Sequence, residues 1–357
     1  MALTYQAGRR VQGTNVDRVG QSAVSGGWKE LGRTTLGSAG DTIDVSSLAN
    51  KRYYMVLTTN IASGIIDARF RLGNGSVDTG SNYARRGSEN GASDVTGTGN
   101  DSLLIPYAEN GNTHFFGVHY FANKSDKEKL LVGNTVDEYA TGSGNAPARF
   151  ENAGKWSNTS DVIDVIRNYN AQSGSFDTNS EMVVLGYDPD DTHTDNFWEE
   201  LADVTLGSDA SEISSGTITA KKYLWVQVYF QNASNSNDVL VRFNNDTGAA
   251  NYAFRHSINY GSDTTLTATS SIKLIDRNAA SDTGRFVNFF AINHSARNKL
   301  LIAHGTEEET SGAGNPPTSN ECVGKWSCEP CQITEIDCFT ESGNIRSGAR
   351  LKVWGSN

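Results

Sequence analysis

Apolar and polar residues alternate along several short segments of this chain. Residues 53–58 carry Tyr54, Val56 and Thr58 in alternation with Tyr53, Met55 and Leu57. Residues 223–230 repeat the pattern, with Leu224, Val226, Val228 and Phe230 in alternation with Tyr223, Trp225, Gln227 and Tyr229. A period of two is typical of a β-strand with one buried face. The pattern predicts that the sets beginning at Tyr54 and Leu224 face a core and that the other sets face outward.

These two segments belong to a long internal repeat. WKEL at Trp28 returns as WEEL at Trp198, and KRYYMV at Lys51 returns as KKYLWV at Lys221, each 170 residues later. The pairs NYARR and NYAFR, TGSGNAP and SGAGNPP, and the two GKWS sequences keep a spacing of 169 or 170 residues. Solenoid units are only ~20–50 residues long, so each copy is expected to form a complete domain. The predicted division is an arm at 1–27, a first domain at 28–186, an acidic linker at 187–197 and a second domain at 198–357.

The strand pattern also predicts the fold class. Each copy contains about eight strand-like segments separated by clusters of Gly, Ser, Thr, Asn and Asp, and no segment keeps a 3.6-residue apolar period. We therefore predict an all-β protein of two tandem β-sandwich domains of jelly-roll type. An immunoglobulin-like sandwich is the second choice, since its domains are nearer ~100 residues. The double jelly roll of some capsid proteins ranks lower, because its halves rarely stay so similar.

Charge and hydropathy limit the partners. The 357-residue chain has a formal net charge of −11, and such an acidic surface repels phosphate. No apolar run approaches the ~18 residues of a membrane-spanning helix, and residues 1–27 contain no apolar core of a secretory signal. We expect no direct nucleic-acid binding and no membrane span. An extracellular location stays open, because virion proteins reach the outside by cell lysis.

The arm differs from the rest of the chain in charge. The arm contains three basic residues, Arg9, Arg10 and Arg18, and one acidic residue, Asp17. It is therefore basic, whereas the rest of the chain is acidic. A segment with no core of its own is expected to order only against a partner. The three arginines are therefore candidates for assembly contacts with a neighbouring subunit, and the alternative is a disordered tail.

All the cysteines lie close together near the end of the chain. Cys322, Cys328, Cys331 and Cys338 are spaced C-x5-C-x2-C-x6-C. The first copy has Asn152, Asn158, Asp161 and Asn168 at the aligned positions, so the fold does not depend on these thiols. Two disulfides, a zinc ion bound by four thiolates, and free thiols are the three interpretations, and disulfides are favoured.

The linker is rich in carboxylates. Asp188, Asp190, Asp191 and Asp195 fall within eight residues, and carboxylate oxygens are the ligands that Ca²⁺ prefers. The segment lacks the glycine and the final glutamate of an EF-hand loop. A solvated acidic hinge is the favoured interpretation, and a calcium site is the alternative. We expect no required cofactor, and zinc at the cysteines or calcium at the linker are the possible exceptions.

Each GKWS sequence places a lysine beside a tryptophan. Trp156 and Trp326 are candidates for stacking on sugar rings, but the favoured interpretation is that both pack in the core. The chain contains no G-x-S-x-G, H-E-x-x-H or phosphate-binding loop motif. His119 aligns with Phe289, and His294 aligns with Lys124, so no histidine site is shared by the two copies. We predict no catalytic residues and no enzymatic activity.

Long phrases of the sequence resemble proteins encoded by marine viruses and phages. These are GRRVQGT, WKELGRTTLGSAGDTIDVSSLANKRYYMVL, GYDPDDTHTDNFWEEL, SSGTITAKKYLWVQ and KVWGSN. The resemblance extends over nearly the whole chain and implies a tandem-repeat structural protein of the virion, in the capsid, on its surface as a decoration protein, or in the tail or a fibre. The family offers no assigned active residues to carry over.

The leading hypothesis is a virion structural protein that acts through assembly contacts with itself and with other virion proteins. The alternative is a carbohydrate-binding surface module that attaches a particle to host glycans. A glycan-degrading enzyme on a β-sandwich ranks third. The expected location is the virion, an extracellular particle.

Overall fold

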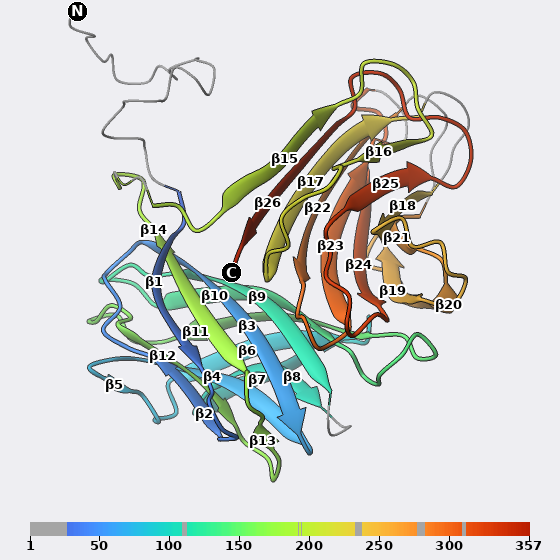
Figure 1. Ribbon diagram of the computed structural model, residues 1–357. Coiled ribbons are helices and arrows are strands. Elements are labelled where there is room, and N and C mark those ends of the chain that lie inside the picture. The colour runs from blue at the N-terminus through green and yellow to red at the C-terminus, as the bar shows by residue number, and fades with distance from the viewer. Residues whose placement is uncertain are drawn as a thin grey trace, which may run out of the picture.

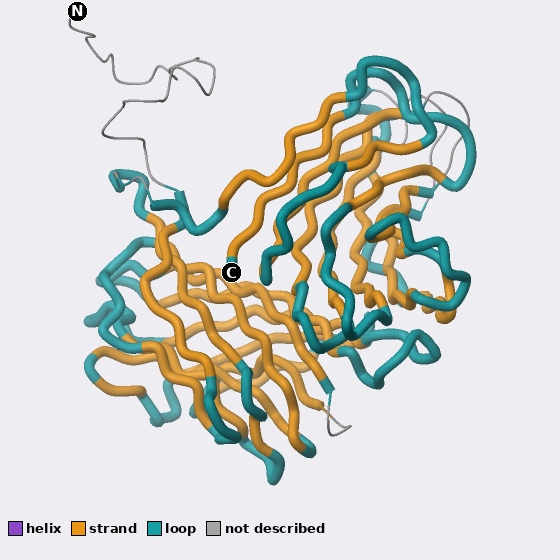
Figure 2. The backbone as a smooth tube through the Cα atoms, viewed as in Figure 1, coloured by secondary structure: helices purple, strands orange, loops and turns teal. Residues whose placement is uncertain are grey.

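The computed structural model describes residues 27–108, 113–191, 193, 195–232, 238–276, 283–308 and 312–357. Within these residues all regular secondary structure is β-strand, as Figure 2 shows. No helix in this part of the chain could therefore cross a membrane. The proposed assembly residues Arg9, Arg10 and Arg18 lie outside the described residues.

The first half of the chain forms one pair of antiparallel sheets (Figure 1). The long sheet has the order β1-β14-β3-β9-β10-β11-β6-β7, with β13 beside β3, and the short sheet has the order β2-β12-β4-β5, with β8 beside β4. The strands are β1 (Lys29–Thr35), β2 (Thr42–Val45), β3 (Tyr53–Ser63), β4 (Ile66–Asn74), β5 (Ser76–Val77), β6 (Tyr83–Glu89), β7 (Val95–Asn100), β8 (Leu103–Ala108), β9 (His114–Ala122), β10 (Lys129–Asp137), β11 (Ala148–Trp156), β12 (Val165–Asn170), β13 (Ser175–Phe176) and β14 (Glu181–Tyr187).

The second half repeats this arrangement. Its long sheet has the order β15-β26-β17-β22-β23-β24-β19-β20, and its short sheet has the order β16-β25-β18-β21. The strands are β15 (Glu199–Thr205), β16 (Glu212–Ser214), β17 (Tyr223–Gln231), β18 (Val239–Phe243), β19 (Tyr252–Ile258), β20 (Thr264–Thr269), β21 (Ile272–Ile275), β22 (Gly284–Ile292), β23 (Lys299–Glu307), β24 (Thr318–Trp326), β25 (Ile336–Thr340) and β26 (Arg350–Ser356). The predicted all-β class with two β-sandwiches is confirmed.

Each sandwich has its own core between its long and short sheets. The sets predicted to face inward do so: Tyr54 and Val56 lie in the first core, and Leu224 and Val226 lie in the second. The opposing short sheets contribute residues such as Phe70 of β4. Alternation along these strands therefore identified the inner faces correctly.

A third core lies between the two sandwiches. It is built from the outer faces of the two long sheets, and its buried members are Met55, Leu57, Phe116, Val118, Val136, Val183, Leu185, Phe197, Tyr223, Phe290, Ile292, Leu300, Ile302 and Val323. Met55, Leu57 and Tyr223 do lie on the outer faces of their sheets, as predicted. They are nevertheless buried, because the other sandwich covers them. Both faces of β3 are buried, one within a sandwich and one between sandwiches.

Polar side chains close the edges of this third core. The Lys325 ammonium donates to the backbone carbonyl of Glu138 at 3.0 Å, and the Asn298 amide donates to the Glu138 carboxylate at 2.6 Å. On the other side the Tyr223 hydroxyl donates to Glu181 at 2.7 Å. Buried polar groups are costly unless they are paired, so these bonds fix how the sandwiches lie against each other.

The segment between the sandwiches is attached to the first one. The backbone N–H of Phe197 donates to the carbonyl of Trp28 at 2.7 Å, and the N–H of Gly27 donates to the Asn196 side chain at 2.9 Å. Phe197 itself is buried in the third core. These contacts join the linker to the start of β1.

Several polar residues are fully buried in the first sandwich, and His119 is one of them. His119 of β9 is 0% exposed and lies edge-on to Phe70, with ring centroids 5.0 Å apart. Gly133 makes room for it, because a Cβ there would lie 2.1 Å from His119 Nδ1. Burial lowers the pKa of His119 to about 3 from its usual 6.5, and the Asn152 side chain offsets this only in part.

Phe289 of the second copy stands at the position of His119. Replacing His119 with phenylalanine is expected to remove one cause of the protein's loss of stability in acid. The unfolded chain protonates this imidazole below pH 6.5 while the folded chain resists until about pH 3. Stability therefore falls as pH falls through this window, by up to about 1.4 kcal/mol per pH unit. His119→Phe should flatten that slope, measured as urea-unfolding free energy at pH 7.5 and 4.5. Phe289→His should introduce a slope of the same sign, and an unchanged slope in His119→Phe would contradict this account.

Candidate functional site

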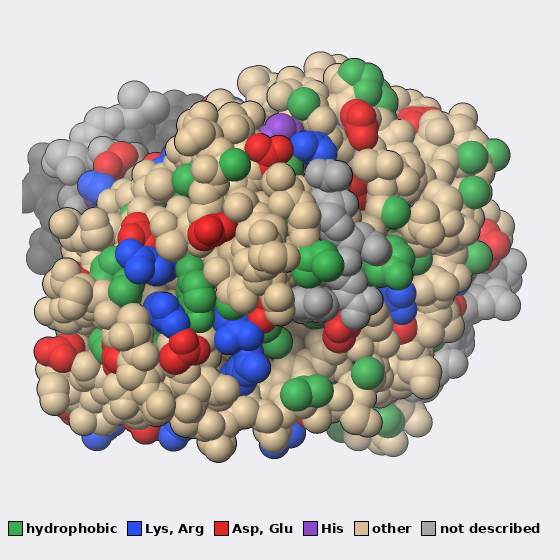
Figure 3. All heavy atoms as spheres, turned by 90° about the horizontal axis from the view of Figure 1, so that it is seen from below, with side chains coloured by type: hydrophobic (Ala, Val, Ile, Leu, Met, Phe, Trp, Pro, Cys, Tyr) green, Lys and Arg blue, Asp and Glu red, His purple; other side chains and the backbone are tan. Residues whose placement is uncertain are grey.

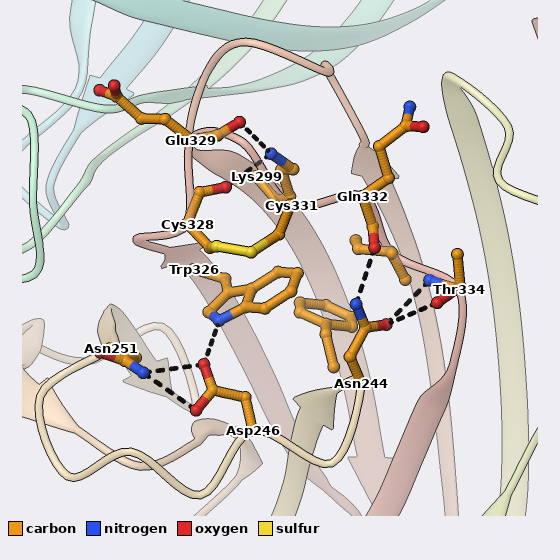
Figure 4. The surroundings of a disulfide bond; sticks show 12 residues. Asn244, Asp246, Asn251, Lys299, Trp326, Cys328, Glu329, Cys331, Gln332 and Thr334 are labelled. Carbon is orange, nitrogen blue, oxygen red and sulfur yellow. Dashed lines mark hydrogen bonds between the residues drawn. A yellow bond between two sulfur atoms is a disulfide. The ribbon is translucent and has the colours of Figure 1, made fainter.

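The cysteines do not form one cluster. Cys328 and Cys331 form a disulfide with their Cα atoms 5.3 Å apart, at the half-buried loop in Figure 4. Cys322 and Cys338 are free thiols in the second core, and burial raises the pKa of each well above its usual value. The four-thiolate zinc site is wrong, and of the two expected disulfides one is present. Within the described ranges no group of three metal-ligating side chains occurs.

The disulfide closes a loop that the first copy closes without sulfur. At the aligned positions the Asn158 amide donates to the Asp161 carboxylate at 2.8 Å. A buried lysine supports both loops: Lys129 donates to the carbonyl of Asn158 at 3.0 Å, and Lys299 donates to that of Cys328 at 2.7 Å. The disulfide therefore has a structural role.

The two tryptophans of the GKWS sequences are core residues. Trp156 is 1% exposed and Trp326 is 2% exposed. The Trp156 indole donates to Asp78 at 2.8 Å, and the Trp326 indole donates to Asp246 at 2.7 Å (Figure 4). The favoured interpretation, packing in the core, agrees with the structure, and stacking on a sugar does not, because neither ring reaches the surface.

The linker carboxylates have separate surroundings and do not point to a shared centre. Asp191 pairs with Lys51, and Asp195 pairs with Lys29 at 2.9 Å. Asp188 accepts the backbone N–H of Arg52 at 3.3 Å, and Asp190 is exposed. These described residues do not gather as the alternative calcium site would require, and the favoured acidic hinge is an anchored connection rather than a free one.

An open aromatic groove lies on the outer face of the first long sheet. It has a volume of about 470 Å³. The residues that define this aromatic groove are Trp28, Tyr53, Tyr120, Leu130, Val132 and Tyr187. Leu130 and Val132 are 54% and 58% exposed, and the Trp28 ring lies 5.8 Å from Tyr187 and 6.3 Å from Tyr120. Sequence analysis missed it, because its residues come from five separate segments.

The same positions in the second sandwich are buried. Strand register aligns Tyr53 with Tyr223, Tyr120 with Phe290, Leu130 with Leu300 and Val132 with Ile302. All four second-copy residues lie in the third core, against the first sandwich. The equivalent surface of the second sandwich is therefore already used for the contact between the two sandwiches.

A polar cavity of about 340 Å³ lies where the two halves meet. Glu151 of the first half and Glu321 of the second half line it, and Arg149 bonds both. Arg149 also pairs with Asp263 at 2.7 Å. Burial raises the pKa of Glu151 to about 7 against the opposing effect of Arg149, and neighbouring Glu321 adds to the rise. This ion cluster joins the sandwiches, and its carboxylates are engaged with Arg149.

The rest of the visible surface is mixed in charge. On the face shown in Figure 3, acidic and basic side chains are interspersed and apolar side chains form small separate groups. Such a surface is ordinary for a folded protein.

Comparison with known proteins adds little to this description. No known protein family matches the chain, and no curated protein matches it. Domains LG4–5 of the mouse laminin α1 chain align with 9% identity over 91% of this chain and 89% of theirs, at a TM-score of 0.21. The LG1–3 region of the laminin α2 chain aligns with 10% identity over 88% of this chain and 64% of that one, at a TM-score of 0.20. Scores this low support no functional argument.

The disulfide can be replaced by the pair found in the first copy. Cys328→Asn with Cys331→Asp should leave the second sandwich folded and cost no more than about 2 kcal/mol, since a loop this short restricts the unfolded chain little. Urea unfolding of the double variant and of the reduced wild-type protein measures this cost. Loss of the folded state on replacement would mean that the loop needs its covalent bond.

Two equivalent positions should respond differently to truncation. Ile302→Ala, in the third core, should destabilise the protein by about 2–4 kcal/mol because it leaves a cavity. Val132→Ala, at the aligned but exposed position, should change stability by less than about 0.5 kcal/mol. Equal costs in urea unfolding would contradict burial of the second-copy surface.

Proposed function

We propose that this protein is a non-catalytic structural component of a virion or similar particle, acting through contacts of its aromatic groove. The observation that carries the proposal is the exposure of this groove at positions whose second-copy equivalents are buried against the first sandwich. Large apolar side chains that gather on a surface usually mark a contact site. The resemblance of long sequence phrases to marine viral proteins supports the proposal that the protein belongs to a particle.

The ionisable residues support a structural role. His114, His119 and His256 are buried, and burial lowers the pKa of each below its usual value. A general base works best with a pKa near the working pH, and burial makes each of these imidazoles a weaker base. The buried lysines Lys129 and Lys299 bond to backbone carbonyls.

Carbohydrate binding is the second candidate. The rings of Trp28, Tyr53, Tyr120 and Tyr187 lie together in the groove, and Tyr53 is 41% exposed. Aromatic rings combine a large apolar face with a polar edge, which suits stacking against a sugar ring. The groove, and not Trp156 or Trp326, is the surface on which such binding would occur.

The test is incorporation into particles. Particles that lack the protein are mixed with purified wild-type protein or with Leu130→Glu, and bound protein is located by cryo-microscopy. Wild-type protein should bind and Leu130→Glu should not, because the variant places a charge in the groove. Val95→Glu is the matched control, since Val95 is 69% exposed on β7 outside the groove.

Equal incorporation of Leu130→Glu and wild-type protein would overturn the proposal. A glycan array run on the same proteins separates the two candidates. Glycan binding by the wild-type protein that is lost in Leu130→Glu, without particle binding, would favour the carbohydrate-binding module.

A further inference from the structure

The contact between the two sandwiches uses a different part of each long sheet. The second sandwich contributes Tyr223, Phe290, Leu300 and Ile302, which align with the aromatic groove. The first sandwich contributes a second set, which consists of Met55, Leu57, Phe116, Val118, Val136, Val183 and Leu185. The two partners in this contact are therefore unlike surfaces, although the sandwiches are copies.

A contact between unlike surfaces of repeated units leaves one surface of each kind free. The free surface of the first sandwich is the aromatic groove. The free surface of the second sandwich aligns with this second set. It consists of Trp225, Gln227, Phe286, Asn288, Thr306, Lys352 and Trp354, with Tyr229 beside them. We call this set the Trp225 face.

The Trp225 face is aromatic and partly open, and Trp225 at its border packs against the third core. Tyr229 is 47% exposed and Phe286 is 40% exposed. Trp225 stacks on Trp354 with ring centroids 4.8 Å apart. Both rings are only partly buried.

We propose that the aromatic groove of one chain binds the Trp225 face of a second copy, repeating between chains the contact that joins the two sandwiches. This inference rests on the proposed function and names the partner. Contacts between unlike surfaces extend from copy to copy and give rings or filaments, whereas self-matching surfaces stop at a dimer. The groove is continuous with the existing contact, since Trp28 and Tyr120 pack against the third core.

Both free surfaces carry polar groups at positions where the buried contact has apolar residues. On the Trp225 face, Gln227 and Asn288 stand where the buried contact has Leu57 and Val118. On the groove, Tyr120 stands where the buried contact has Phe290, which adds a hydroxyl. The Trp225 indole and the Gln227 amide both donate to the Asn288 oxygen, at 2.6 and 3.2 Å. A contact between amides and tyrosine hydroxyls is more polar than the third core, so it should be reversible and depend on concentration.

The experiment is sedimentation velocity of the full chain over a range of concentrations. Wild-type protein should form species heavier than the 38.5 kDa chain. Val132→Glu in the groove and Phe286→Glu on the Trp225 face should each weaken association at least about tenfold, because each places a charge in the contact. Tyr229→Glu is a second variant of the Trp225 face, and Val95→Glu is the control. Thermal unfolding checks that every variant is folded.

Mixing the two variants is the sharpest test. Val132→Glu keeps its Trp225 face and Phe286→Glu keeps its groove, so an equimolar mixture should recover a species of two chains and nothing larger. Wild-type protein that stays monomeric, or a mixture that stays monomeric while wild-type protein associates, would overturn the inference. Monomeric wild-type protein that still enters particles through the groove would overturn this inference alone and leave the proposed function standing.

Discussion

Burial of the outer faces of the two long sheets against each other is the contact on which the rest of the structure depends. A β-sandwich can leave these faces to water, and alternation of apolar and polar residues is the usual sign that it does. Here Leu57 and Val183 are fully buried on the outer side of the first sheet, in the same core as Phe290 and Ile302 of the second. The contact removes large apolar side chains from water, which is the main favourable contribution to folding. It also sets which parts of each sheet stay open.

The sequence was informative wherever a property belongs to one strand. The alternation at residues 53–58 and 223–230 identified the inward residues, and the 170-residue spacing predicted a second sandwich built like the first. The independence of the two domains stays a prediction. Burial of Met55 could not be foreseen, because its outer neighbours come from the other copy. The groove was missed for the same reason, since a surface assembled from five strands and loops has no signature along the chain.

The candidate sites chosen by residue type were mostly structural. Trp156 and Trp326 suggested sugar binding, yet an aspartate under each ring satisfies its indole and holds it in the core. Spacing in the sequence also overstated the cysteine cluster, because β24 and β25 lie in different sheets and carry Cys322 and Cys338 away from the loop. The two copies show that the same loop can be closed by a hydrogen bond between an amide and a carboxylate or by a disulfide. The loop in the two copies therefore does not depend on one kind of bond.

The anchored linker has a consequence for how the chain can be divided. Phe197 is part of the third core and its backbone bonds to Trp28, so the connection holds to both sandwiches. A protease nick among residues 188–196 would cut the covalent path but leave the apolar faces joined. The two fragments should then stay together as a non-covalent complex. A separately produced first half would expose the Leu57 and Val183 surface and would need its complement to remain in solution.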